Sequence, residues 1–297
     1  MFVGLSAFPL TPMYDNSVDE KSFIGLIQRL VNAEVDSIGV LGSTGNYTYL
    51  TREERKRVAQ IAVQHAKEIP VMVGISALNL RDVLLNAEDA QTAGASAVLL
   101  APMSYQQLTE NEVYKLYEVV TSRLSVPLCV YDNPGTTHFN FSDELHGRIA
   151  QLPNVRSIKI PGVPMESQAA LDRVNRLRDL IPKHVSIGIS GDFCAVTGLN
   201  AGCDVWYSVI GGLFPKVAQS LTVAAQKGDA EEALRLSKRL VPMWELFHRN
   251  GGSLRVVAAA AEILNLVKPP CMPLPLRALE GKERKELALL LNDLELS

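Results

Sequence analysis

Helix-start signals recur along this chain at intervals of about thirty residues. Three of them are capping boxes, in which a serine or threonine and a glutamate three residues later satisfy each other's free backbone N–H groups. The boxes begin at Ser17, Thr51 and Thr109. Asn79 and Ser142 are further candidate N-caps, with acidic residues in the turn that follows. Because this interval matches one strand plus one helix, the chain is predicted to repeat a β–α unit.

Short hydrophobic runs stand before these caps and continue beyond them. The runs span residues 2–7, 36–41, 70–74, 97–100, 127–131, 154–160, 185–189 and 204–208. Helical segments follow the last three runs, near 165–180, 192–201 and 214–226. Strands that alternate with helices favour a parallel sheet, and eight units fit the TIM (β/α)8 barrel. An open doubly wound sheet is the competing architecture, but the glycine-rich dinucleotide fingerprint expected after its first strand is absent.

The predicted fold class is therefore α/β, a TIM (β/α)8 barrel with a C-terminal helical subdomain. Residues 1–227 would form the barrel and carry the active site, and residues 228–297 would form the helical extension. In the extension, Asp229 could cap a helix that runs through His248, and a last helix would span Arg277–Leu294.

Composition excludes several classes of function. A net charge of −3 and a pI near 6.0 argue against a nucleic-acid partner, since no basic stripe could neutralise phosphates. No run of about twenty apolar residues predicts a membrane span, and the first residues lack the pattern of a secretory signal. The four cysteines form no CxxC pair and the five histidines show no zinc spacing, so we expect reduced cysteines, no metal and a cytoplasmic location.

Lys159 ends one of the predicted strands, within residues 154–162. Strand alternation places Lys159 on one face and Ile158 and Ile160 on the other. In a closed barrel the isoleucines would contact the helices and Lys159 would point into a water-poor interior, which lowers the pKa of its amine. A neutral amine can attack a carbonyl carbon and form a Schiff base. Taken alone, this window is more typical of a lysine that ends an edge strand and extends into solvent; the rest of the chain favours the interior position.

The loops after the strands are where a barrel of this type carries its active site. The second predicted strand ends in Gly42, Ser43, Thr44 and Gly45. The glycines let the backbone approach a ligand closely, and the two hydroxyl residues offer donors suited to a carboxylate. A plain glycine-rich turn is the alternative interpretation.

Aromatic residues stand at the ends of further strands. Tyr131 ends the fifth strand, and alternation turns it inward beside Lys159, where a phenol could carry protons during imine formation. A core tyrosine with a satisfied hydroxyl explains that pattern equally well. Tyr105 follows the fourth strand and could be a surface or an interface residue, whereas Gly191 and Tyr207 stand at the ends of strands seven and eight.

Four segments resemble the dihydrodipicolinate synthase / N-acetylneuraminate lyase family of class I aldolases. They are GSTGN from Gly42, YDNPG from Tyr131, SIKIPG from Ser157 and SGD from Ser190. They occur in register with predicted strands two, five, six and seven, and the resemblance covers essentially the whole chain. It implies a lysine-dependent lyase or synthase, usually a homotetramer built as a dimer of dimers. It also implies no cofactor, because the imine itself accepts the electrons.

The resemblance assigns roles to the reacting residues. Lys159 would form an imine with pyruvate or another 2-oxo acid, and Tyr131 would transfer protons. Ser43 and Thr44, with Gly42 before them, would hold the carboxylate of the 2-oxo acid. A tyrosine that matches Tyr105 reaches across a tight dimer interface in family members and would complete a proton relay with Thr44 and Tyr131.

Other assignments concern the substrate that adds to the imine. The backbone carbonyl of Tyr207 would lie near the Schiff base, and Gly191 would line the substrate site. Thr136 stands where dihydrodipicolinate synthases carry an arginine that clamps the second substrate's carboxylate bidentately. A hydroxyl cannot replace a guanidinium, so condensation with aspartate semialdehyde should be poor. His138 and Phe139 could instead shape a pocket for a neutral, hydroxylated or aromatic second substrate.

Two smaller departures are Asn46, where the family loop usually has glutamate, and Pro161, where a small polar or acidic residue is common. Three functional hypotheses remain. The first is a lyase, aldolase or dehydratase that acts on pyruvate or a related 2-oxo acid together with an aldehyde or its adduct. The second is 4-hydroxy-tetrahydrodipicolinate synthase with an altered clamp. The third, from another class, is a ketoacid-binding protein without catalytic activity.

Overall fold

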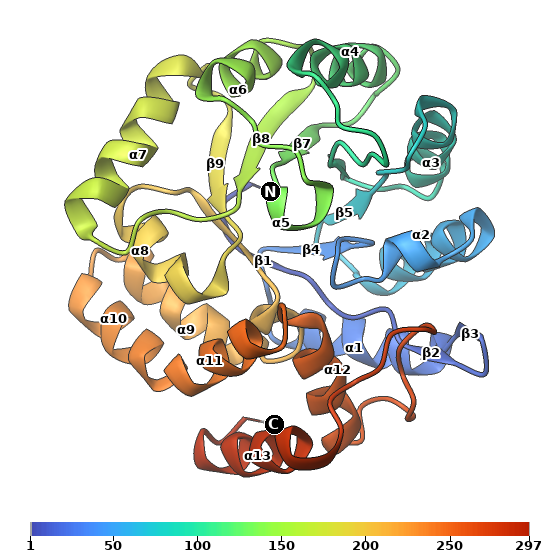
Figure 1. The fold of residues 1–297 in the computed structure, drawn as a ribbon, viewed down its shortest axis with the longest axis vertical. Helices are drawn as coiled ribbons and strands as arrows, with labels where there is room; N and C mark the ends of the chain where they lie inside the picture. Colours follow the sequence, from blue (N-terminus) through green and yellow to red (C-terminus); the bar gives the residue numbers. More distant parts are fainter. Residues whose placement is uncertain (1, 297) are drawn as a thin grey trace.

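Parallel strands close into a barrel at the centre of the molecule, and helices surround them (Figure 1). The computed structural model describes residues 2–296. The barrel strands are β1 (Gly4–Ala7), β4 (Ser37–Val40), β5 (Val71–Gly74), β6 (Ala97–Leu100), β7 (Leu128–Tyr131), β8 (Val155–Ile160), β9 (Ser186–Ile189) and β10 (Val205–Ser208). Each pairs in parallel with its neighbour along the chain, and β1 closes the ring between β10 and β4. The predicted (β/α)8 barrel is confirmed, and the open sheet is excluded.

The helices outside the ring follow the strands in turn. They are α1 (Glu20–Asn32), α2 (Arg52–His65), α3 (Leu80–Thr92), α4 (Glu110–Thr121), α6 (Asp143–Ala150), α7 (Ser167–Leu180), α8 (Ala195–Asn200) and α9 (Pro215–Gln226). The capping boxes at Thr51 and Thr109 and the caps at Asn79 and Ser142 are confirmed, each with its side chain accepting a backbone N–H bond. Within residues 2–296, no helix has the length and apolar character needed to cross a membrane.

The capping box predicted at Ser17 is wrong. Ser17 pairs with Tyr14 in a small antiparallel hairpin formed by β2 (Met13–Tyr14) and β3 (Ser17–Val18). The N-cap of α1 is Asp19, whose carboxylate accepts from the backbone N–H of Ser22. The hairpin takes up the serine, and an aspartate two residues later can serve equally well as a cap.

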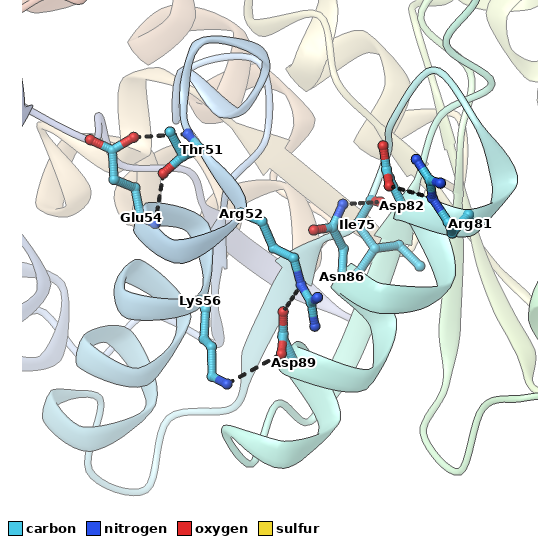
Figure 2. A network of polar contacts seen from close by, with 9 residues as sticks. All are labelled: Thr51, Arg52, Glu54, Lys56, Ile75, Arg81, Asp82, Asn86 and Asp89. Atoms are coloured by element: carbon cyan, nitrogen blue, oxygen red, sulfur yellow. Dashed lines mark hydrogen bonds and ion pairs between the residues drawn. The ribbon is translucent and has the colours of Figure 1, made fainter.

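Polar contacts join the outer helices α2 and α3, as Figure 2 shows. The buried Asp89 carboxylate accepts from Arg52 Nε at 2.6 Å and pairs with Lys56 Nζ at 3.5 Å. On the same helix, Asn86 Nδ2 donates to the carbonyl of Ile75, which follows β5. These contacts fix α3, and the loop before it, relative to the barrel.

Short helical turns sit in several loops at the C-terminal ends of the strands. They are η1 (Tyr47–Tyr49), α5 (Pro134–Thr137), η2 (Asp192–Cys194) and η3 (Ile210–Gly212). The helix predicted near 192–201 is therefore divided into η2 and α8. These turns set the direction of the polar side chains around the mouth of the barrel.

The C-terminal segment is helical and lies along one side of the barrel (Figure 1). Its helices are α10 (Ala230–Arg239), α11 (Val241–Arg249), α12 (Leu254–Ile263) and α13 (Gly281–Asp293). Asp229 is the N-cap of α10, as predicted, but the helix expected to continue through His248 divides at Leu240, because Pro242 in the first turn of α11 cannot continue a helix. The last helix starts at Gly281 rather than at Arg277, whose carbonyl instead accepts from Arg255. The predicted boundary after residue 227 falls between α9 and α10.

Candidate active site

Lys159 lies on the inner face of β8, near the C-terminal end of the barrel. It pairs in register with Tyr131 of β7 on one side and Gly188 of β9 on the other. Its exposed fraction is 3%, although it is a lysine. Ile158 and Ile160 point outward into the aliphatic layer under the helices. The predicted alternation is confirmed, and the solvent-exposed alternative for Lys159 is wrong.

Three aromatic rings surround the amine of Lys159. Its Nζ atom lies 3.9 Å from the ring centroid of Phe8, 4.2 Å from that of Tyr131 and 5.5 Å from that of Tyr207. Two strand glycines leave space for the rings of Phe8 and Tyr207. A Cβ at Gly39 would lie 2.3 Å from the Phe8 ring, and one at Gly188 would lie 2.2 Å from the Tyr207 ring.

This enclosure changes the proton affinity of the amine. Burial removes water from the ammonium form and lowers the pKa of Lys159 to about 8, although nearby Cys129 and Asp192 oppose the shift. The ring faces also attract an ammonium group, but this attraction is smaller than the loss of hydration. A substantial fraction of the amine is therefore neutral near physiological pH and able to act as a nucleophile.

Beside the amine, the Tyr131 hydroxyl belongs to a cluster of polar side chains. It lies 3.4 Å from Ser43 Oγ and accepts from Asn133 Nδ2 at 2.9 Å. The same Nδ2 lies 3.3 Å from Ser43 Oγ and 2.6 Å from Thr136 Oγ1. Burial raises the pKa of Tyr131 well above its usual range, so the phenol keeps its proton at neutral pH.

Asn133 is the member of this cluster that the sequence did not single out. Its signal was present, because it lies in the YDNPG segment directly after β7, where a side chain faces the mouth of the barrel. Its amide connects the loop after β4 with the loop after β7, two segments about ninety residues apart. Thr136 is exposed on α5, and its hydroxyl contacts Asn133.

The loop after β4 is held by backbone and side-chain hydrogen bonds. The N–H of Gly45 donates to the carbonyl of Gly42 at 2.9 Å, which closes a turn around Ser43 and Thr44. Asn46, with a buried side chain, donates from Nδ2 to the carbonyl of Thr11 at 3.1 Å. A Cβ at Gly42 would lie 2.9 Å from the Phe8 ring, so the glycine allows this loop to approach the ring beside Lys159. The loop is a fixed element of the site.

Below the amine, polar groups continue inside the barrel. Tyr207 points inward, and its hydroxyl lies 2.6 Å from Ser157 Oγ and accepts from Cys129 Sγ at 3.4 Å. Both tyrosine and serine are fully buried. At the mouth, a Cβ on Gly191 would lie 2.9 Å from the Pro161 carbonyl, so the loops after β8 and β9 are in close contact there.

Tyr105 stands apart from the rest of the predicted site. Its side chain is 92% exposed on the loop between β6 and α4, whereas Thr44 is buried with an exposed fraction of 4%. The single chain therefore does not bring Tyr105 together with Thr44 and Tyr131. The relay expected from the family resemblance requires a second copy of the chain, so it stays a prediction.

A buried acid–base pair lies behind the strand that carries Tyr131. Asp132 and His146 are 6% and 0% exposed, and Asp132 Oδ2 lies 3.4 Å from His146 Nε2. Burial raises the pKa of Asp132 and lowers that of His146, because each charged form loses hydration there. Both groups thus tend toward their neutral forms next to the site.

Comparisons with known proteins find relatives that match nearly the whole chain. Residues 1–294 match the model of the dihydrodipicolinate synthetase family. A 4-hydroxy-tetrahydrodipicolinate synthase from Rickettsia canadensis is 26% identical over 298 residues, which cover 100% of this chain and 98% of the relative. The solved structure of dihydrodipicolinate synthase from Agrobacterium tumefaciens has a TM-score of 0.94 at 45% identity and covers 99% of this chain and 98% of its own.

A chloride-inhibited dihydrodipicolinate synthase from Acinetobacter baumannii, solved in complex with pyruvate, is more distant. Its TM-score is 0.89 at 24% identity, with full coverage of both chains. At this identity the likeness concerns the fold alone.

Proposed function

The chain belongs to the dihydrodipicolinate synthetase family, whose members are enzymes of the lyase and aldolase type, and we propose that it forms an imine between Lys159 and pyruvate or a related 2-oxo acid. The observation that carries the proposal is the amine of Lys159, 3% exposed and 4.2 Å from the Tyr131 ring. Within residues 2–296 no carboxylate forms an ion pair with Lys159. A buried lysine of this kind needs a reason to persist, because burial of its charge costs free energy.

The proposed reaction begins when the neutral amine attacks the keto carbon of the 2-oxo acid. The carbonyl oxygen takes up protons and leaves as water, and Tyr131, whose ring lies 4.2 Å from the amine, would supply them. In the cleavage direction, the 4-hydroxyl of the bound adduct loses its proton, the C3–C4 bond breaks, an aldehyde leaves, and the electron pair passes to the iminium to give an enamine. A proton added at C3 restores the iminium, and water then releases the 2-oxo acid and restores Lys159.

The carboxylate of the 2-oxo acid would bind at the turn formed by Gly42, Ser43 and Thr44. This turn reaches the amine from the side of Phe8 and carries a hydroxyl 3.4 Å from the Tyr131 phenol. A carboxylate bound there would hold the keto carbon above the amine and its oxygen near the phenol. Such positioning supplies much of the rate increase in reactions between two bound groups.

The second substrate is the finer question. Thr136 offers only a hydroxyl, already within 2.6 Å of Asn133, at the position where an arginine would clamp a second carboxylate. We therefore propose that condensation with aspartate semialdehyde is slow and that the enzyme acts mainly on other aldehydes or their adducts. The second candidate is 4-hydroxy-tetrahydrodipicolinate synthase itself, the name carried by curated relatives at 26–28% identity. A turnover rate with aspartate semialdehyde that equals the rate with other aldehydes would favour it.

The proposal extends to assembly and location. Tyr105 exposes 92% of its side chain, which suits a residue covered by a second copy, and we propose a homotetramer built as a dimer of dimers and located in the cytoplasm. Analytical ultracentrifugation of the native protein and of Tyr105→Ala tests the assembly. A monomeric native protein would contradict it.

The direct test is reduction of the imine. The protein is incubated with pyruvate and sodium borohydride, digested, and analysed by mass spectrometry. We expect an irreversible Nε-(1-carboxyethyl) adduct on Lys159, with none in the absence of pyruvate or in Lys159→Met. Exposed Lys115 serves as a lysine control in the same digest. An unmodified Lys159 would end the imine mechanism and leave the non-catalytic ketoacid-binding protein as the better hypothesis.

Tyr131→Phe separates binding from proton transfer. The ring beside the amine is kept and the hydroxyl is removed, so we expect turnover to fall by roughly 100-fold or more, as for the loss of a positioned proton donor. Unchanged turnover would remove Tyr131 from the mechanism.

A further inference from the structure

An apolar groove opens between the end of β9 and helix α11, and Gly191 is the one predicted site residue that lines it. Its volume is about 990 Å³, at the upper end of the range of roughly 300–1,000 Å³ typical of small-molecule sites. Its apolar lining consists of Phe193, Val209, Val241, Trp244 and Phe247. The side chains of Phe193 and Val241 are 55% and 43% exposed, so this apolar surface is open to solvent.

The floor of this groove, which we call the α11 groove, is the end of the strand next to Lys159. Ser190 and Gly191 line it. Gly188, which pairs with Lys159, faces the barrel interior, and Ser190 is two residues further along on the same face, a rise of about 7 Å. The N–H of Ser190 donates to the carbonyl of Ile160, so the strand pairing continues to this point. The α11 groove therefore begins one side-chain layer above the amine.

The walls of the α11 groove favour an apolar and flat occupant. The rings of Trp244 and Phe247 lie 5.5 Å apart on one side, and the exposed ring of Phe193 lines the groove from η2. Aromatic side chains bind other aromatic rings through stacked or edge-to-face contacts and large buried areas. A short hydrophilic aldehyde would leave these surfaces in contact with water.

The charges in the α11 groove do not favour a carboxylate. Arg249 Nη2 is paired with Glu286 Oε1 at 2.6 Å, and Glu245 adds another negative charge. Asp192 uses its carboxylate to accept from the backbone N–H of Ile210 and from other donors of the same loop. Among the described lining residues, the one guanidinium is thus already committed, so an acidic aldehyde would meet more negative than positive charge.

From these observations we infer that the α11 groove binds the distal part of the second substrate and selects aldehydes with an aromatic or similarly apolar group. The inference rests on the proposed function, because it needs the imine at Lys159. In the condensation direction, the enamine carbon derived from the pyruvate methyl group attacks the aldehyde carbon and a C–C bond forms. The aldehyde oxygen takes one proton, and water releases the 4-hydroxy-2-oxo acid from Lys159.

A second copy of the chain is the other possible occupant of an exposed apolar surface. The floor of the α11 groove argues for the substrate, since it is the strand end beside the amine rather than an outer helix. The experiment distinguishes the two occupants.

The test compares benzaldehyde with acetaldehyde as acceptors in condensation with pyruvate. We expect kcat/KM to be at least about tenfold higher for benzaldehyde in the native protein. The ratio of kcat/KM for benzaldehyde to that for acetaldehyde should fall about tenfold in Phe193→Ala, which loses a ring. It should fall less in Val241→Ser. Leu289→Ala is the matched control, because Leu289 is 66% exposed on α13 and does not line the α11 groove. It should leave the ratio unchanged.

Each result decides between the hypotheses. A borohydride adduct on Lys159 without a preference for benzaldehyde would overturn the inference and leave the proposed function intact. Absence of the adduct would overturn both. If Phe193→Ala changes the sedimentation coefficient and leaves the aldehyde ratio unaltered, the α11 groove is a contact between copies and the inference is wrong.

Discussion

The two faces of strand β8 contact different kinds of side chain. On β8, Ile158 and Ile160 point into an aliphatic layer shared with the helices, and they are 0% and 1% exposed. Ser157 and Lys159, on the other face of the same strand, meet hydroxyls and aromatic rings. Both pairs are buried, but the two isoleucines pack among apolar side chains and the inner pair carries groups that can exchange protons.

This difference separates stability from chemistry within a single strand. Burial of the outer residues stabilises the fold through apolar surface removed from water. The inner residues lose hydration without a full set of partners, which costs stability and changes the pKa of the amine. A shift of one residue in the strand register would turn the isoleucines inward and Lys159 outward. Burial of the isoleucines therefore also fixes the position of Lys159.

The largest effect should come from the inner face. Lys159→Ala removes the nucleophile, and lyase activity should fall by as much as roughly 10⁶-fold, the scale seen when a nucleophile is removed. Circular dichroism should show the native fold, since no ion pair is broken. Turnover of pyruvate or its adducts by Lys159→Ala in steady-state assays would remove the imine from the mechanism.

Substitution of Ile158, on the outer face, should lower stability and leave activity nearly unchanged. Ile158→Ala leaves a cavity under the helices and should lower the free energy of unfolding by roughly 2–5 kcal/mol. Activity per folded molecule should stay near that of the native protein, because Ile158 does not face the site. Denaturant unfolding and titration of the borohydride-trapped sites measure the two quantities. Loss of activity without loss of stability would break the separation.

An intermediate effect should follow when a strand glycine gains a side chain. In Gly188→Ala, the new Cβ would lie 2.2 Å from the Tyr207 ring, so this ring must leave its present position near Lys159. We expect a loss of roughly 1–3 kcal/mol in stability together with slower imine formation. Gly25→Ala, on α1 with open space around it, is the matched control and should be neutral or stabilising by up to about 1 kcal/mol. An equal response to both changes would mean that the ring position is unimportant.

The smallest expected effect is a dependence on pH. With the pKa of Lys159 at about 8, the neutral fraction of the amine and the rate of imine trapping should rise about tenfold from pH 7 to pH 9. In the folded state this pKa lies below its ordinary value of 10.5, so the unfolded chain holds more protons between pH 8 and 10.5. The contribution of Lys159 to stability therefore increases with pH across that window and is lowest below pH 8.

Stopped reactions at several pH values give the trapping rate, and Lys159→Met provides the reference for stability. The increase in stability between pH 8 and 10.5 that Lys159 contributes should be absent in Lys159→Met. A trapping rate that is constant from pH 7 to pH 9 would indicate an amine that is already neutral at pH 7, or one that is paired.

Local patterns in the sequence predicted the parts of this structure that depend on local physics. Strand alternation placed Lys159 and Tyr131 on the inner face, and capping chemistry located the starts of α2 and α4. The error at Ser17 has the same origin, because a hairpin two residues long leaves too little pattern to recognise. The family resemblance joined these positions into one site.

Contacts between distant segments could not be predicted in this way. Phe8, Gly39 and Gly188 share in the enclosure of the amine, but each belongs to a different strand or loop, and their fit depends on the closure of the ring. For Tyr207, only the backbone carbonyl was expected near the Schiff base. The structure also places its ring 5.5 Å from the Lys159 amine and its hydroxyl 2.6 Å from Ser157 Oγ. The position of Tyr105 depends on a second copy, which one sequence does not describe.

The side-chain amide of Asn133 has fewer hydrogen atoms than there are oxygens around it. Its amide group has two hydrogens, and three oxygens, on Ser43, Tyr131 and Thr136, lie within reach of the same nitrogen. At any instant one oxygen lacks a donor from this amide. Several proton arrangements are therefore available to this cluster, and a rotation of one hydroxyl converts one into another. The phenol can change partners during a catalytic cycle while all of the heavy atoms stay in place.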